Sequence, residues 1–532
     1  MKKNFLPISF LSLVLLAFTA CRKENTTWKN DWVAPIINDT LSLGNFYNDS
    51  TLIAGTNGTI DLDFSRTILD VGIADIVKIP DTSIVQIFHP TVAGLTIPPG
   101  FDVFNAVEEH SLSLPVIQLK KIRVYSGKIT LKVYNPLNTM ALYKVILPGV
   151  LKNGVLFEQS YSVPAGTQAN PGTSTAILDV SGYEMDLRGI NGTHFNVLRS
   201  QLNVKTDPLG PSISLNLSDE FKVEAKIENL KLDYALGYFG NQIISDTSTL
   251  TVPYLDNITA GLLDLPSVNL QVEIENGMKV PIKGIISLIE NTNTNNQTVS
   301  LTASSLGQPI LISPAIGSWN TLQPSTNEIA FNATNSNVEQ VLENLGSTYN
   351  LGYSIQLNPL GNVNGSWDEI FSTSRIKVKL KAQMPLQLMA DGLTLQDTFD
   401  VNLKQTSPNI SVVAGKLILE AMNAFPMQCE VKLSFLTDQG FTIEEVFGTS
   451  LIQSANYGAI DPVDGLRKKL SILEFVFPES LINSLDLIKK LKVEVQLNTP
   501  NPINGVNQTV AIPYGAFVGV KIKTAFQTKV SY

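Results

Sequence analysis

Cysteine and histidine, which build many catalytic and metal sites, are scarce in this chain. Its 532 residues include 2 cysteines and 3 histidines. The histidines His89, His110 and His194 lie far apart, and none has another histidine or a cysteine at a metal-ligand spacing, so we expect no zinc site. Phosphate-binding loops, dinucleotide-binding glycine patterns and a Gly-x-Ser-x-Gly nucleophile turn are also missing. The sequence therefore predicts no cofactor, no metal and no enzyme activity.

Charge is also low. Charged residues make up 16% of the chain, against about 25% in a typical soluble domain. The formal net charge of −9 and the pI near 5.1 argue against a nucleic-acid partner, because phosphate binding needs clustered lysine and arginine. The hydrophobic content of 44% is enough for sizeable cores. Beyond residue 20 no apolar run is long enough for a membrane helix.

The N-terminus has the pattern of a secretory signal. Lys2 and Lys3 precede an apolar run from Ile8 to Phe18, and Thr19-Ala20-Cys21 follows, which is typical of an exported protein. The ending resembles the lipobox of bacterial lipoproteins, with Phe18 where leucine is usual. The resemblance implies removal of residues 1–20, lipidation of Cys21 and attachment to a membrane by acyl chains. An ordinary cleaved signal is the alternative.

Three copies of one strand pattern follow. In each, an alternating apolar strand ends in asparagine, at Asn135, Asn276 and Asn423, and the alternation resumes 8, 10 and 12 residues later. This predicts a hairpin or a strand–turn–strand unit whose asparagine bonds the turn backbone and tolerates left-handed dihedral angles. The asparagines are 141 and 147 residues apart, a spacing that indicates tandem domains rather than solenoid turns.

The predicted fold is mainly β, with three tandem β-sandwich-like modules of about 140 residues and few short helices. Helical spacing occurs at 337–345 and 478–485. The alternation from Val520 to Tyr532 predicts the last strand of the third module. The predicted units are a signal peptide (1–20), an N-terminal anchor and β-rich segment (21–120), and modules at 121–257, 258–409 and 410–532.

The first copy resembles the water-stress, late-embryogenesis-abundant β-sandwich domain. It has a strand ending in Asn135-Pro136, a second strand, and an apolar-proline turn at Val163-Pro164. Gly277 and Ala424 replace the proline in the other copies. The resemblance implies a β-sandwich and brings no catalytic residues.

The opening with Trp28 and Trp32 is similar to that of uncharacterised envelope lipoproteins of Bacteroidota, which implies an envelope location. We expect this tryptophan pair to pack the first strand onto the first module. A binding surface is the alternative.

Carboxylates are the one kind of catalytic residue that the chain does not lack. Paired carboxylates could hydrolyse glycosides if they faced one cleft. The candidate pairs are Asp61 with Asp63, Asp219 with Glu220, and Glu444 with Glu445. Asp61 and Asp63 alternate within a strand, so we expect them to share a solvated face. The adjacent pairs would point to opposite faces of an extended strand.

The remaining polar candidates have simpler structural explanations. The loops 291–297 and 461–465 are rich in oxygen ligands but lack calcium-loop spacing, so we expect ordinary turns. We expect His89 and His194 in loops. His110 follows Glu108 and Glu109 and could titrate or shuttle protons, but we expect it in a solvated turn. Cys429 falls on the apolar positions of an alternating run, which predicts a buried, unreactive thiol.

These features predict an outer-membrane lipoprotein of a bacterial envelope, periplasmic or surface-facing, attached through acylated Cys21. We expect a non-catalytic structural or binding component that presents tandem β modules to envelope proteins or surface polymers. Two alternatives stay open: a carrier of lipid or another hydrophobic ligand, with an apolar groove, and a carbohydrate-active enzyme.

Overall fold

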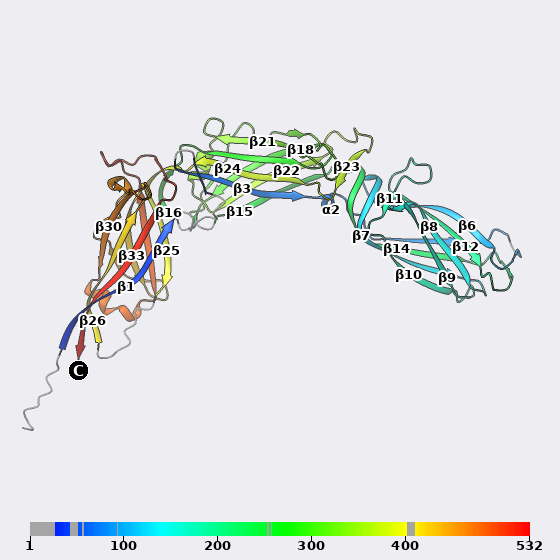
Figure 1. The fold of residues 1–532 in the computed structure, drawn as a ribbon, viewed down its shortest axis with the longest axis horizontal. Coiled ribbons are helices and arrows are strands. Elements are labelled where there is room, and N and C mark those ends of the chain that lie inside the picture. The colour runs from blue at the N-terminus through cyan, green and yellow to red at the C-terminus, as the bar shows by residue number, and fades with distance from the viewer. Residues whose placement is uncertain are drawn as a thin grey trace, which may run out of the picture.

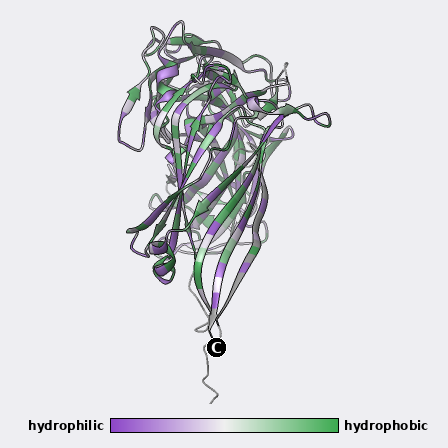
Figure 2. Cartoon of the chain, turned by 90° about the vertical axis from the view of Figure 1, so that its left-hand side faces the viewer, coloured by the Kyte–Doolittle hydropathy of each residue, from purple (hydrophilic) through white to green (hydrophobic). Residues whose placement is uncertain are grey.

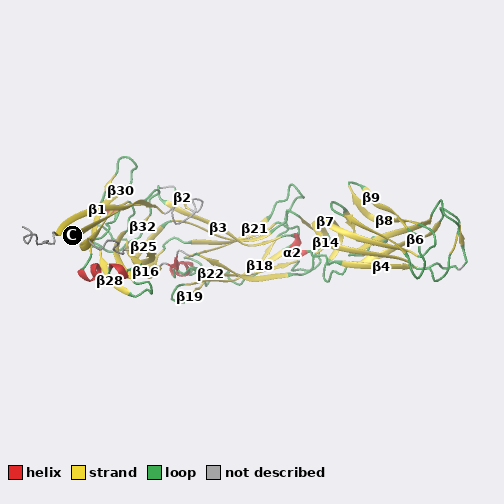
Figure 3. Cartoon of the chain, turned by 90° about the horizontal axis from the view of Figure 1, so that it is seen from below, coloured by secondary structure: helices red, strands yellow, loops and turns green. Residues whose placement is uncertain are grey.

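The computed structural model describes residues 27–42, 52–55, 58–92, 94–252, 255–256, 258–401 and 410–531. Cys21 and the signal segment lie outside them. The predicted fold class is confirmed, since strands dominate and helices are few and short (Figure 3). Three β-sandwiches stand in a row, and the C-terminus lies at one end of it (Figure 1). Hydrophobic and hydrophilic residues alternate along many strands (Figure 2), as expected for strands with one buried face.

All three sandwiches share one strand order. In one layer, a strand from the N-terminal segment pairs with the last long strand, which pairs with the strand that ends in asparagine. In the first sandwich, this layer is β4 (Thr82–Phe88), β14 (Phe221–Tyr238), β7 (Gln118–Asn135) and β10 (Gly172–Asp179), and the second layer is β6 (Asp102–Ser111), β12 (Val197–Thr206), β8 (Ala141–Lys152) and β9 (Val155–Val163). The short strand β11 (Glu184–Asp186) pairs with both β7 and β8 and joins the two layers.

The second and third sandwiches repeat this order. The second has β3 (Ile60–Val71), β24 (Ile376–Pro385), β17 (Asn269–Asn276) and β21 (Ser325–Asn332) in one layer, with β2 (Leu52–Ala54) beside β3, and β15 (Ile243–Thr251), β22 (Thr348–Leu357), β18 (Ile282–Thr292), β19 (Thr298–Ser300) and β20 (Ile310–Ile312) in the other. The third has β1 (Thr27–Ser42), β33 (Phe517–Ser531), β26 (Ile410–Asn423), β30 (Arg467–Val476) and β29 (Ala459–Ile460) in one layer, and β16 (Ile258–Asp264), β25 (Gln387–Asp400), β31 (Lys490–Asn498), β27 (Gln428–Leu436), β28 (Thr442–Phe447) and β32 (Val510–Ala511) in the other. Shorter elements complete the chain: β5 (Thr96–Ile97), β13 (Ile213–Ser214), β23 (Asp368–Phe371), α2 (Ile73–Ile76), α3 (Val338–Glu343), α4 (Glu479–Asn483), η3 (Ala455–Tyr457) and η4 (Leu485–Leu487).

The N-terminal segment visits the three sandwiches in reverse order. β1 pairs with β33 in the third, β3 with β24 in the second, and β4 with β14 in the first. In Figure 1 the blue β1 and the red β33 lie in the same lobe. The prediction that the first strand packs onto the first module is wrong, because Trp32 is in register with Phe526 of β33. The segment predicted at 21–120 supplies edge strands to all three sandwiches.

Each repeat asparagine fastens a turn between the two layers. Asn276 is fully buried. Its Oδ1 accepts from Met278 N at 3.0 Å, and its Nδ2 donates to the carbonyls of Val280 and Ser313 at 2.8 and 2.9 Å. Asn135 and Asn423 make the same three bonds, to residues two and four positions ahead and to a distant carbonyl. The predicted bonding to the turn backbone is therefore confirmed.

The unit is a strand–turn–strand rather than a hairpin. β17 and β18 lie in different sheets, as do β26 and β27, so the turn crosses between layers. None of the three asparagines has a positive φ, so the left-handed backbone that asparagine tolerates is not used.

The predicted register holds with one slip. Val145, Ile286 and Leu433, ten residues after each asparagine, are all buried. Between Ile286 and Leu288 the register shifts. As a result, Leu288 is half-buried and Ile289 takes the core position, because a bulge moves the following side chains to the other face.

Both predicted helices are present as α3 and α4, the second preceded by Pro478. Asn337 precedes α3, but its Oδ1 accepts from Thr302 N at 2.6 Å rather than from the helix. In the ranges that the structure describes, no helix is long and apolar enough to cross a membrane.

Candidate functional site

The three predicted carboxylate pairs are engaged in local contacts or separated. On β3, Asp61 is half-buried and Asp63 is exposed. Asp219 is buried and accepts from Asn216 N at 2.8 Å, which closes its own turn. On β28, Glu444 bonds Ser480, whereas Glu445 bonds Ser434 and pairs with Lys432 of β27.

The histidines divide into two classes. His89, just beyond β4, and His194, before β12, are exposed loop residues as predicted. The prediction for His110 is wrong, because it lies within β6, is half-buried, and has its Nε2 2.7 Å from Ser200 Oγ. The glutamates before it belong to the same alternating strand, so they do not mark a turn. Burial lowers the pKa of His110.

Cys429 is half-buried in β27 and packs against the third core. Burial raises the pKa of its thiol to about 12, so at neutral pH the group stays protonated, and a protonated thiol is a poor nucleophile. In the loop 461–465, Asp461 and Asp464 both pair with Lys468, at 2.8 and 2.5 Å. That lysine supplies the positive charge that a calcium ion would bring. Across the described residues, no group of three or more His, Cys, Asp or Glu could hold a metal ion.

An apolar cavity of about 50 Å³ lies between the layers of the first sandwich. Inward-facing side chains such as Leu131, Leu147 and Leu198 line it, and Gln86 and His110 lie among its polar groups. Pockets that hold drug-sized ligands measure about 300–1,000 Å³. The cavity is far smaller than the groove that a lipid carrier needs.

The joint between the first and second sandwiches is tightly bonded. Arg123 of β7 holds Asp233 with a bidentate pair at 2.8–3.0 Å, and this bond raises the pKa of Arg123. The same guanidinium lies 3.9 Å from the ring centroid of Trp319, which belongs to the second sandwich. Trp319 also meets Phe371 edge to face at 5.0 Å. The short strand β23, in the segment that leads into β24 of the second sandwich, pairs here with β14 of the first.

The joint between the second and third sandwiches is built from backbone. Only Leu386 separates β24 from β25. Its N–H donates to Ile60 at 2.8 Å, and its carbonyl accepts from Ile512 at 3.1 Å. Ile60 and Ile512 are buried in a small cluster with Phe425. Both joints therefore join neighbouring sandwiches through paired or hydrogen-bonded backbone and buried side chains.

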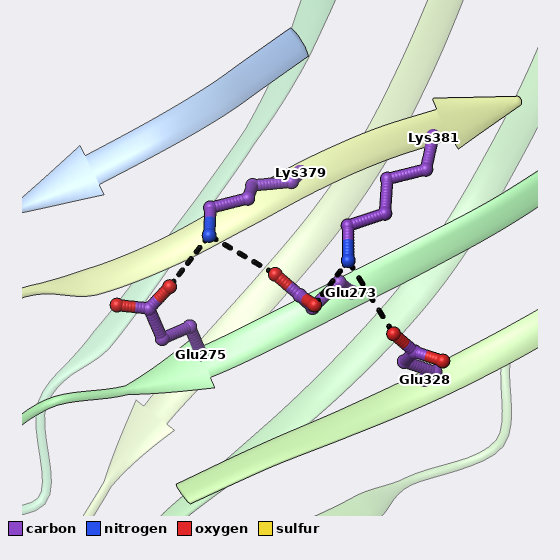
Figure 4. A network of polar contacts seen from close by, with 5 residues as sticks. All are labelled: Glu273, Glu275, Glu328, Lys379 and Lys381. Atoms are coloured by element: carbon purple, nitrogen blue, oxygen red, sulfur yellow. Dashed lines mark hydrogen bonds and ion pairs between the residues drawn. The ribbon is translucent and has the colours of Figure 1, made fainter. Parts of the chain in front are cut away.

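A network of five charged residues covers the outer face of the second sandwich (Figure 4). Lys379 bonds Glu273 at 3.0 Å and Glu275 at 2.6 Å, and Lys381 bonds Glu273 and reaches Glu328 at 3.4 Å. The Glu273 side chain is only 10% exposed. Burial alone would raise the pKa of Glu273, but the bonds from both lysines lower it below its ordinary value. The network links β17, β24 and β21.

This network was visible in the sequence only in part. Glu273 and Glu275 alternate on one repeat strand, and Lys379 and Lys381 on a later one. Complementary alternating charges are the signal of neighbouring strands, but they do not give the register that sets Glu273 opposite Lys379.

Replacing Glu273 by glutamine is expected to destabilise the protein by about 1–2 kcal/mol at neutral pH, since it removes two charge-assisted bonds. The folded-state pKa of Glu273 lies below its unfolded value of about 4.3, so the ionised carboxylate stabilises the folded protein above that pH. This stabilisation is lost as the pH falls through the folded-state pKa. The raised pKa values of Lys379 and Lys381 change the stability only at alkaline pH, where lysines lose their protons. Urea melts of wild type and variant should therefore converge in acid.

Glu328→Gln is the matched control, because Glu328 is 49% exposed and 3.4 Å from Lys381. Its effect should stay within about 0.5 kcal/mol. If the stability of the Glu273→Gln variant depended on pH in the same way as that of wild type, Glu273 would not be the stabilising carboxylate of the network.

Comparison with known proteins gives little. No protein-family model matches the chain, and no curated protein is significantly similar to it. Among solved structures, it is similar to a presumed secreted protein from Parabacteroides distasonis, at 12% identity, over 66% of this chain and 99% of that one, with a TM-score of 0.19. A structure of infectious bursal disease virus shares 9% identity over 85% and 79% of the two chains, with a TM-score of 0.09. At such TM-scores neither likeness carries an argument.

Proposed function

We propose that the protein is a lipid-anchored, non-catalytic stalk of a bacterial envelope, attached through Cys21 and presenting its first sandwich away from the membrane. The observation that carries this proposal is the path of the N-terminal segment. Its first strand, β1, begins at Thr27, six positions after Cys21, and belongs to the third sandwich. The first sandwich stands at the opposite end of the row (Figure 1). An anchor at Cys21 would thus hold one end and leave the other free.

The two joints support a stalk rather than a flexible string of domains. One continuous hydrophobic core runs through the first and second sandwiches, and the second and third share the cluster around Ile60. Strands of 10–18 residues, such as β24 and β7, are about 33–60 Å long at 3.3 Å per residue. Three sandwiches in a row therefore reach on the order of 100 Å.

Changing Cys21 to alanine is expected to release the protein from membranes or to leave it unprocessed, because the lipid attachment site is gone. The change should also abolish palmitate labelling. Cys429→Ala is the matched control, since it removes the other cysteine and should leave membrane partitioning intact. Cell fractionation with metabolic labelling measures both. Wild-type protein in the soluble fraction, without label, would end the lipoprotein proposal.

A further inference from the structure

A polar pocket of about 160 Å³ opens beside the joint between the first and second sandwiches. Its lining residues come from different parts of the second sandwich. The loop between β20 and β21 supplies Trp319 and Asn320, the segment leading into β24 supplies Thr373 and Arg375, and β24 itself supplies Lys377. The pocket brings together an aromatic ring, an amide, a hydroxyl, two cations and the Glu275 carboxylate. A small set of convergent polar groups beside an aromatic wall is typical of a ligand site.

One of these cations has no carboxylate partner. Across the strands, Lys377 lies opposite Asp70 and Glu275. Asp70, however, bonds Arg375 Nε at 2.9 Å, and Glu275 bonds Lys379 Nζ at 2.6 Å. Among the ion pairs of the described residues, none includes Lys377. Its charge therefore remains available to an anion that enters the pocket.

The aromatic wall is held in place from behind. Trp319 is half-buried, with the Arg123 guanidinium 3.9 Å from its ring centroid and Phe371 against its edge. Its loop is ordered by the bridge between Ile316 and Gln323. A fixed indole ring suits a ligand with an apolar C–H face, and the Asn320 amide and the Thr373 hydroxyl suit hydroxyl groups around that face.

We propose that this pocket binds a sugar unit that carries a carboxylate. The sugar ring packs on Trp319, its hydroxyls bond Asn320 and Thr373, and its carboxylate pairs with Lys377. The volume of the pocket suits a single sugar unit, so a longer polymer would present its units one at a time. The site goes beyond the stalk function and does not depend on the anchor.

The test uses unacylated protein, residues 22–532, which keeps every described strand. Calorimetric titration with a short oligomer of glucuronic acid should show binding that weakens with salt, because the ion pair is partly screened. A glucose oligomer of equal length should bind at least tenfold more weakly. Lys377→Met should weaken glucuronate binding by roughly tenfold or more, as expected for a charge-assisted bond. Asn320→Ala should weaken both sugars.

Lys521→Met is the matched control, because Lys521 is an exposed lysine of β33 in the third sandwich; it should leave binding unchanged. Thermal melts establish that each variant is folded. Three outcomes would overturn the proposal: no binding of the glucuronic acid oligomer, equal binding by the Lys377→Met variant, or acetate competing as well as glucuronate. The last result would reduce the pocket to a simple anion site.

Discussion

A chain that starts at residue 43, and so lacks β1, is expected to lose the cooperative unfolding of its third sandwich. β1 pairs with β33 along its length, from Thr27 opposite Ser531 to Ser42 opposite Phe517. Removing it turns β33 into an edge strand with unpaired backbone groups. At about 1 kcal/mol per net hydrogen bond, the loss is on the order of 10 kcal/mol, comparable with the whole stability of a domain.

The matched control is a chain that starts at residue 27, which lacks the same N-terminal tail but keeps β1. Circular dichroism melts of the two chains should differ by an early transition in the shorter one, and limited proteolysis should cut its C-terminal third first. Identical melts would show that β1 adds nothing to the third sandwich. They would also remove the structural link between the N-terminus and that end of the row, on which the proposed stalk depends.

The same pairing bears on where the chain divides. The predicted boundary near residue 410 separates β25 (387–400) from its partner β31, and it leaves β1 out as well. A fragment of residues 410–532 therefore lacks the edge strand β1 from one layer and both β16 and β25 from the other. We expect that an independently folding third sandwich needs residues 27–42, 258–264 and 387–400 in addition.

Local patterns in the sequence predicted the strands better than their partners. Alternation placed Val145 and Leu433 in the core, because side-chain direction depends only on the residue's place along a strand. It did not show that β1 crosses to β33, because a pairing between residues almost 500 positions apart leaves no trace in local spacing. His110 was expected in a solvated turn, but exposed strand positions also carry charged residues, as the acidic pair before it in β6 shows. The Trp319 pocket was not foreseen, because it forms only where the loop that carries Trp319 meets the start of β24, and segments so far apart leave no local pattern.

Replacing Asn276 by alanine is expected to destabilise the second sandwich by about 3–5 kcal/mol. The change leaves the carbonyls of Val280 and Ser313 and the N–H of Met278 without their partner, and each buried group left unpaired costs about 1–3 kcal/mol. Asn276→Asp keeps the Oδ1 acceptor but loses both Nδ2 donors, so it separates the turn bond from the two bonds to carbonyls. Denaturant melts of the full chain measure both variants.

Asn295→Ala is the matched control, since Asn295 is exposed in the same sandwich and should change stability by no more than about 0.5 kcal/mol. The repeat extends this prediction to the other two sandwiches. Asn135→Ala and Asn423→Ala break the same three bonds in the first and third sandwiches, so each should destabilise its own sandwich by a similar amount. If only one of the three asparagines proved important, the shared turn would be a coincidence of sequence. Three equal losses would establish it as the common fastening between the two layers of every sandwich.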